Sequence, residues 1–210
     1  FDVIRKIKKM ANFKKIGHAG TLDPLATGML GIAFGEATKS IKYFSNIKQY
    51  FFEITFGSAT DTDDITGKIM KKTEYIPNIS EIKNCLNNFI GKIEQIPPYY
   101  SAVKVNGQRA YKLARNNEKF KLSKKKIDIY SLSLEKQSSE NCYLFKADCS
   151  SGTYIRSLAR DIALNLSSLG FISSLRRTKL GRFDEKDLIS LEKFKELVHN
   201  GDHFDILHII

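Results

Sequence analysis

The chain has 210 residues, of which 42% are hydrophobic and 27% charged, an ordinary composition for a globular protein with one sizeable core or two small ones. The net charge of +11 favours a polyanionic partner such as nucleic acid, although an AT-rich genome would also enrich lysine. The three cysteines, Cys85, Cys142 and Cys149, include no Cys-x-x-Cys pair, which argues against a disulfide framework and a zinc site. No apolar run could span a bilayer and no signal peptide is recognisable, so we expect a cytoplasmic protein without membrane contact.

The first quarter of the chain predicts a helix, a loop and two strands. Residues 2–10 place apolar side chains at helical spacing between lysines, which predicts a basic amphipathic helix. A glycine-rich loop leads into the apolar run 29–34, which predicts a buried strand, and residues 36–44 suggest a short helix. Residues 49–56 are aromatic and β-branched, as in a strand, and a polar acidic loop follows at 60–66.

The middle of the chain is divided by turn signals. Residues 67–73 suggest another strand, and Ser80 is the predicted N-cap of a helix that runs to about Ile90. An extended segment follows, and Pro97-Pro98 interrupts it. The pair Asn106-Gly107 is a strong signal for a tight hairpin turn.

The second half alternates helices with strands. The predicted elements are a short helix, two paired strands, a helix, a basic strand and a last helix, at residues 109–115, 126–135, 143–149, 153–166, 174–183 and 190–199. Because helices and strands are interspersed and hairpin signals imply antiparallel pairing, the expected fold class is α+β.

The most informative segment is Gly-His-Ala-Gly-Thr-Leu-Asp-Pro-Leu-Ala-Thr-Gly at 17–28. Its glycines and its proline impose a specific loop, and the loop contains a single carboxylate, Asp23. One interpretation is a tight turn in which Asp23 bonds its own backbone, and spacing alone favours it. The other is a stiff loop that presents one carboxylate of an enzyme.

This segment resembles the catalytic loop of the TruB family of pseudouridine synthases, in its bacterial type. The resemblance implies the pseudouridine synthase fold, a mixed, largely antiparallel sheet flanked by helices, with an RNA-binding cleft. It also implies that Asp23 is the catalytic carboxylate and that His18 contacts RNA near a flipped nucleotide, whereas His18 could otherwise be a structural loop histidine. Isomerising uridine needs no redox change or phosphate donor, so we expect neither a cofactor nor a metal.

A second motif surrounds Tyr50. The pattern Lys48-Gln49-Tyr50, followed by Gly57 and by Thr-Asp-Thr-Asp-Asp at 60–64, is similar to a family motif in which the tyrosine stacks on the target base. Without the resemblance, Tyr50 would be an ordinary strand residue. The acidic loop lacks the twelve-residue pattern of a calcium site, so its carboxylates are expected to orient loops or to pair with arginines.

A third motif joins a strand to a helix at 150–158. Its N–H groups could hold a phosphate, or the segment could be a plain turn with helix caps. It resembles the family motif Gly-Thr-Tyr-Ile-Arg, which implies that Tyr154 lies by the base, with a possible role as proton acceptor at C5, and that Arg156 pairs with Asp23. Leu175 matches the apolar residue set against the base; the alternative is a core leucine followed by two arginines on a solvated edge.

The resemblance also predicts the domain organisation. A catalytic domain is expected over 1–200, with an RNA-clamping insertion at about 95–125 and a short remnant at 201–210 that is too small for an additional RNA-binding domain. The family's N-terminal Lys-Pro-x-Gly strand is missing, which we ascribe to truncation of the sequence. The short C-terminus argues against the archaeal and eukaryotic relatives that work with guide RNA.

The expected function is conversion of uridine 55 to pseudouridine in the T-loop of transfer RNA. The enzyme would cleave the N-glycosidic bond and re-form a C-glycosidic bond, with the T-arm of tRNA as partner and a monomer as the expected state. The alternative is a non-catalytic protein that binds or folds tRNA and retains the fold. A third possibility is a pseudouridine synthase with another RNA target.

Overall fold

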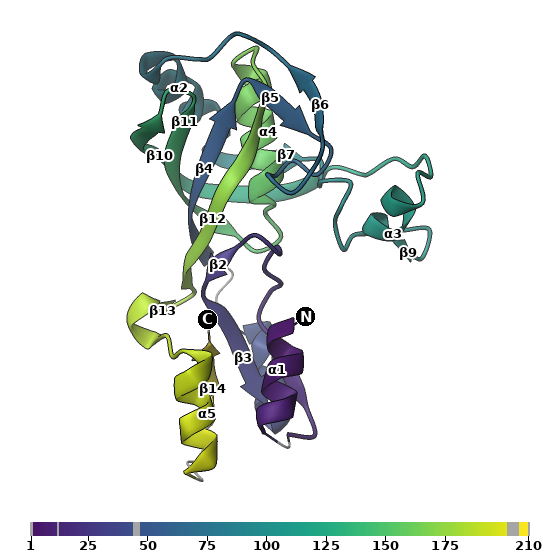
Figure 1. The fold of residues 1–210 in the computed structure, drawn as a ribbon, viewed down its shortest axis with the longest axis vertical. Coiled ribbons are helices and arrows are strands. Elements are labelled where there is room, and N and C mark those ends of the chain that lie inside the picture. The colour runs from purple at the N-terminus through teal and green to yellow at the C-terminus, as the bar shows by residue number, and fades with distance from the viewer. Residues whose placement is uncertain (1, 12, 44–46, 201–205, 210) are drawn as a thin grey trace. The chain divides into compact units, whose positions relative to one another are not determined.

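The computed structural model describes residues 2–11, 13–43, 47–200 and 206–209 (Figure 1). The chain forms two compact units: unit 1 comprises Phe1–Tyr50 and Arg176–Ile210, and unit 2 comprises Phe51–Leu175. Strands β4 (Ile47–Phe56) and β12 (Gly170–Leu180) each contribute residues to both units. No helix in the described part of the chain is long and apolar enough to cross a membrane.

Unit 1 contains a three-stranded antiparallel sheet in the order β1-β3-β14. Its central strand, β3 (Leu30–Phe34), is buried at every position, so the strand predicted from the apolar run is confirmed. β1 (Ile16–His18) pairs with one side of β3 and β14 (Ile206–Ile209) with the other. The predicted remnant therefore contributes a strand at 206–209; residues 201–205 and 210 lie outside the described residues.

Two helices contribute to the core of unit 1, α1 (Asp2–Met10) and α5 (Leu191–His199). Ile7 and Phe194 are fully buried and belong to the same core cluster as Phe34. The rings of Phe34 and Phe194 stack with centroids 5.8 Å apart. α1 has the predicted bounds, and the last helix begins at its predicted cap, Ser190, whose Oγ accepts from the Lys193 N–H at 3.1 Å.

Besides its parts of β4 and β12, the described part of unit 1 contains four further short elements. They are β2 (Thr27–Gly28), η1 (Gly35–Tyr43), β13 (Phe183–Asp184) and η3 (Glu185–Asp187). η1 is a 3₁₀ helix at the place where the sequence predicts a short helix. β2 runs parallel to the unit 1 part of β12, with Thr27 opposite Arg176 and Gly28 opposite Arg177. This pairing fixes the C-terminal end of the glycine-rich loop.

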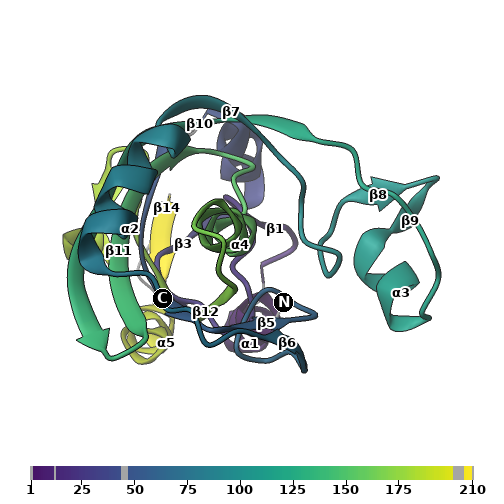
Figure 2. The ribbon, with the colours of Figure 1, turned by 90° about the horizontal axis from the view of Figure 1, so that it is seen from above.

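Unit 2 is built on an antiparallel sheet. β10 (Lys125–Ser139) pairs with β11 (Cys142–Ser150) on one side and with β7 (Gly91–Gln95) on the other. Alternate residues of β11 are buried, as the alternating sequence predicts. The strands curve around α4 (Ile155–Asn165), which is seen nearly end-on in Figure 2.

The helix predicted at 80–90 is α2 (Ile79–Leu86), continued by η2 (Asn87–Phe89). The predicted cap, Ser80, is wrong, because the N-cap is Asn78. The Asn78 side chain accepts from the Glu81 N–H at 3.0 Å, and the Glu81 carboxylate accepts from the Asn78 N–H at 2.8 Å. This reciprocal capping box satisfies two main-chain donors, whereas Ser80 lies inside the first turn.

Two hairpins complete unit 2. One is formed by β5 (Ser58–Thr60) and β6 (Ile69–Lys72), which flank the acidic loop. The other is formed by β8 (Lys104–Val105) and β9 (Gln108–Arg109), and α3 (Ala110–Arg115) follows it. Asn106 and Gly107 have φ values of 48° and 84°, which confirms the predicted turn. Both views show this hairpin and α3 to one side of the sheet of unit 2 (Figures 1 and 2).

Candidate active site

In unit 1, Asp23 lies in the loop between β1 and β2. Its main-chain carbonyl accepts from the Ala26 N–H at 2.9 Å, which closes a turn with Pro24 at the second position. Asp23 also lines a hollow of about 410 Å³ together with His18, Leu22 and residues of α1. The two interpretations of this segment are therefore compatible, because the backbone makes a tight turn and the residue lines a cavity.

Glycines at both ends of this loop allow close approaches. Gly20 has φ = +93° and Gly28 has φ = +88°, a region that side chains other than glycine rarely adopt. A Cβ at residue 20 would lie 2.7 Å from the Lys48 ammonium, and one at residue 28 would collide with the main-chain carbonyl oxygen of Arg177. Gly20 thus leaves room for the Lys48 side chain, and Gly28 allows β2 to pair closely with β12.

His18 lies at the end of β1 and is half-buried. Burial lowers the pKa of His18, and the nearby positive charges of Arg177 and Lys48 lower it further. The neutral imidazole is therefore favoured at neutral pH, with one nitrogen able to donate and the other able to accept a hydrogen bond.

Tyr50 is the last residue of unit 1 before the boundary within β4. Its side chain is 7% exposed, and the neighbouring Gln49 accepts a hydrogen bond from the Thr178 hydroxyl at 3.0 Å. Tyr50 thus occupies a buried strand position, and its stacking on a base remains a prediction.

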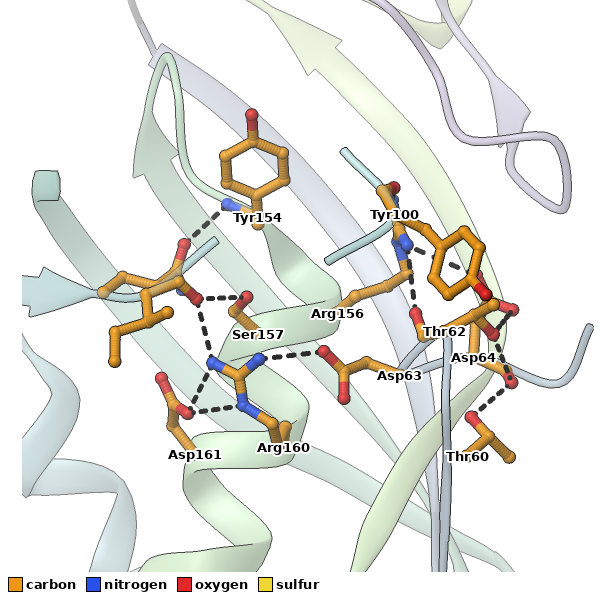
Figure 3. A network of polar contacts seen from close by, with 12 residues as sticks. Thr60, Thr62, Asp63, Asp64, Tyr100, Tyr154, Arg156, Ser157, Arg160 and Asp161 are labelled. Atoms are coloured by element: carbon orange, nitrogen blue, oxygen red, sulfur yellow. Dashed lines mark hydrogen bonds and ion pairs between the residues drawn. The ribbon is translucent and has the colours of Figure 1, made fainter. Parts of the chain in front are cut away.

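In unit 2, Tyr154 is the residue before the first turn of α4 (Figure 3). Its main-chain N–H donates to the Gln95 side-chain oxygen at 2.9 Å, and Gln95 is only 1% exposed. This donor is therefore occupied, which removes one of the N–H groups that the phosphate interpretation of the segment requires. The bond also fixes the backbone of Tyr154 to the end of β7.

Arg156 follows on the first turn of α4 and is 4% exposed. It forms an ion pair with Asp64, with Nε 3.7 Å from the carboxylate, and it donates to the main-chain carbonyls of Thr62 at 3.0 Å and Tyr100 at 3.2 Å. Asp64 also accepts from the hydroxyls of Thr62 and Thr66. The prediction that carboxylates of the acidic loop pair with arginines is confirmed.

A second arginine, Arg160, extends this network (Figure 3). Its guanidinium contacts Asp63 at 2.9 Å, Asp161 at 3.0 Å and the main-chain carbonyl of Ile96 at 2.9 Å, and Ser157 donates to the same carbonyl at 2.8 Å. Burial raises the pKa of both carboxyls, while the Arg160 charge acts in the opposite direction. Arg160 was not among the predicted site residues, although its spacing of four from Arg156 places both arginines on one helix face.

The structure thus assembles the predicted residues unit by unit. His18 and Asp23 line the same hollow in unit 1, and Tyr154 and Arg156 stand together at the start of α4 in unit 2. Leu175 is 4% exposed. The pairing of Arg156 with Asp23 remains a prediction. The suggestion that Arg177 belongs to a solvated edge is wrong, because this arginine is completely buried.

Comparison with known protein families shows to which family this chain belongs. A model of the N-terminal domain of TruB family pseudouridylate synthases matches residues 8–155, and a model of the C-terminal domain of tRNA pseudouridylate synthase B matches residues 156–207. The chain belongs to the TruB family. The family resemblance of the three motifs is thereby confirmed.

Curated relatives support the same assignment. A tRNA pseudouridine synthase B of Ehrlichia ruminantium (strain Gardel) is 46% identical over 203 residues, covering 96% of this chain and 69% of the relative. An enzyme of the same name from Borreliella burgdorferi (strain ZS7) is 42% identical over 231 residues, covering 98% and 82%. The predicted enzyme class, a tRNA pseudouridine synthase, is confirmed.

The fold is shared with solved structures. A chain of a Cbf5-Nop10-Gar1 complex superposes with a TM-score of 0.72 at 28% identity, covering 96% of this chain and 52% of that one. The present chain thus spans about half the length of that structure. The predicted α+β pseudouridine synthase fold is confirmed. Within the described residues, no group of three His, Cys, Asp or Glu side chains could hold a metal ion.

Proposed function

We propose that this chain converts uridine 55 of the T-loop of tRNA to pseudouridine, with Asp23 as the catalytic carboxylate. The observation that supports this role most directly is the placement of Asp23 on a closed turn, beside His18, in the wall of a hollow. A carboxylate on a rigid loop can be presented to a bound nucleotide with little reorganisation. Family membership gives the reaction class, and the loop supplies the acid group.

The reaction requires one bond exchange at the ribose. The bond between N1 of uracil and C1′ breaks, the base turns, and C5 bonds to C1′; the proton leaves C5 and N1 gains one. Asp23 acts at the ribose as nucleophile or as base. Tyr154, held at the start of α4 by Gln95, is our candidate for the proton acceptor at C5.

The remaining predicted residues bind the nucleotide. Tyr50 would stack on the target base, Leu175 would contact it from an apolar side, and His18 would support the RNA near the flipped nucleotide. Stacking of a base on an aromatic side chain is worth roughly 1–3 kcal/mol. Arg156 would pair with Asp23 and hold its carboxylate in place.

The T-arm of tRNA is the proposed partner. The net charge of +11 supports a polyanionic ligand, and the predicted insertion at 95–125 has exposed basic residues on β8, β9 and α3, among them Lys104, Arg109 and Lys112. We propose that this segment clamps the RNA, that residues 1–200 act as one catalytic domain, and that the protein works as a cytoplasmic monomer.

The decisive experiment measures tritium release from T-arm RNA labelled at C5 of uridine, followed by mass spectrometry of the product. Asp23→Asn should lower turnover by at least about 10²-fold. The matched control is Asp128→Asn, a half-buried carboxylate on β10 with no assigned role, which should keep normal turnover. Normal turnover of Asp23→Asn would defeat the assigned role. Tight T-arm binding by the wild-type protein with no product would favour the non-catalytic alternative.

A further inference from the structure

The loop that contains Asp23 is tied at both ends to one side chain. The Arg177 Nε donates to the main-chain carbonyl of Met29 at 2.7 Å, and its Nη2 donates to the carbonyl of Gly20 at 3.2 Å. Asp23 lies between these two residues in the sequence. A single guanidinium therefore closes the base of the loop.

The backbone of Arg177 adds further ties at the same place. The Met29 N–H donates to the Arg177 carbonyl at 2.8 Å, and Gly28 lies opposite Arg177 in the parallel pairing of β2 with β12. No side chain fits at residue 28, because it would meet that carbonyl. The C-terminal end of the loop is thus fixed by both the main chain and the side chain of residue 177.

The burial of Arg177 excludes the simplest alternative. Its side chain is fully buried, so it cannot reach an RNA phosphate as a surface arginine would. Burying a guanidinium is costly unless its donors are bonded. Here Nε and Nη2 bind main-chain carbonyls, whereas Nη1 has no hydrogen-bond partner among the described residues. The planar fork of arginine can span two acceptors, which the single ammonium of lysine does less well.

We propose that Arg177 is a positioning residue for the Asp23 carboxylate. It holds the two ends of the 20–29 loop at a fixed separation, so that the turn at Asp23 stays in its productive shape. The inference rests on the proposed function, because it assumes that Asp23 performs the chemistry. Small displacements of a reacting group can lower a rate by about 10²-fold, so loosening the base of this loop should affect turnover rather than RNA affinity.

The first test uses Arg177→Met and Arg177→Lys in the T-arm assay. Both variants should lower kcat, the methionine variant by about 10²-fold, while the Kd for T-arm RNA stays at the wild-type value. Arg182→Met is the matched control, because Arg182 is exposed and packs on the Phe183 ring, and its kcat should be unchanged. A loss of RNA affinity equal to the loss of kcat would overturn the proposal, and so would normal kcat.

A second variant tests the position of the loop without removing the positive charge of Arg177. Gly28→Ala keeps Arg177 and pushes β2 away from the Arg177 carbonyl, so it should lower kcat without changing Kd. Gly35→Ala is its control: Gly35 also has a positive φ, +53°, but nothing stands within 4 Å of a Cβ there. If the Arg177 variants do not fold, this pair decides, and equal kcat for the two variants would overturn the proposal.

The same assay distinguishes a failure of the proposed function from a failure of the positioning role of Arg177. An inactive wild-type protein, or an active Asp23→Asn, defeats the proposed function. An active wild-type protein with an inactive Asp23→Asn and fully active Arg177 and Gly28 variants defeats the positioning role alone. His18 supplies a site-specific check by NMR, since its pKa should rise in Arg177→Met, where a nearby positive charge is lost, and stay unchanged in Arg182→Met.

Discussion

The two units hold their candidate site residues by different means. In unit 1, the Asp23 loop is shaped by glycines and tied through main-chain carbonyls to the buried Arg177. In unit 2, the start of α4 is held by charged side chains, with Arg156 on Asp64 and Arg160 on Asp63. The first arrangement depends on shape and the second on paired charge, so the two should respond differently to substitution and to pH.

The difference has an energetic basis. Backbone carbonyls do not titrate, so the ties at the ends of the Asp23 loop remain over a wide pH range. A buried ion pair, by contrast, leaves an uncompensated charge when one partner is removed. We therefore expect substitutions at the buried ion pairs of unit 2 to cause the larger losses in the free energy of unfolding. We also expect the stability of unit 2 to depend on the protonation of its carboxylates.

The largest effect should come from breaking the buried pair in unit 2. Arg156→Met leaves Asp64 as a buried carboxylate without its guanidinium, and the side chains of both partners are 5% exposed. The free energy of unfolding should fall by about 3–5 kcal/mol. Urea denaturation followed by circular dichroism measures this loss.

The control for that experiment is a surface pair of the same unit. Lys124 and Glu94 are 3.2 Å apart with side chains 62% and 52% exposed, so Lys124→Met should cost at most about 1 kcal/mol. If both substitutions cost the same, the buried pair does not hold the start of α4 and the comparison between the units fails.

A smaller effect concerns the pH dependence of unit 2. Because burial raises the pKa of Asp63 above its ordinary 3.8, the folded protein binds its proton more tightly than the unfolded chain. This contribution to stability is complete below about pH 3.8 and is lost as the pH rises through the raised pKa. Asp63→Asn removes it, so the stability of the variant relative to wild type should increase with pH across that window.

Urea midpoints measured at intervals between acidic and neutral pH test this sign. Asp161→Asn should behave in the same direction, since burial also raises the pKa of Asp161. A difference between variant and wild type that stays flat with pH would show that burial does not govern these carboxyls.

The smallest effect belongs to His18 in unit 1, where the sign is opposite. Its folded pKa lies below 6.5, so the unfolded chain binds the proton more tightly, and stability should fall as the pH drops from 6.5 through the folded value. NMR titration of the His18 ring should give a midpoint below 6.5, and His18→Gln should lose this acid-dependent fall. A midpoint at or above 6.5 would contradict the burial and the charges assigned to the loop.

Much of the fold follows from local signals in the sequence. The bounds of α1, the cap of α5 and the Asn106-Gly107 turn were predictable, because periodicity, a capping serine and a glycine pair act over a few residues. β3 was predictable because its apolar run is continuous. Asp23 and Tyr154 were identified as candidate site residues by family resemblance, because residue spacing alone does not assign them a role.

Other features depend on contacts between distant segments. Ser80 looked like a cap because serine is favoured there, yet the reciprocal bonds of Asn78 and Glu81 start the helix earlier. Arg177 resembled a surface arginine, and only the tertiary fold brings it to the Gly20 and Met29 carbonyls. Short strands such as β1 and β14 lack a periodic signal and form because β3 offers two edges.

The pairing of β14 with β3 has a practical consequence for anyone preparing shorter versions of this protein. Cutting the chain after residue 200 would remove β14 and leave main-chain N–H and C=O groups of β3 without their partners. An uncovered strand edge of this kind recruits other copies of the same strand. Such a product should therefore associate with itself and precipitate, even though its candidate active-site loop is intact.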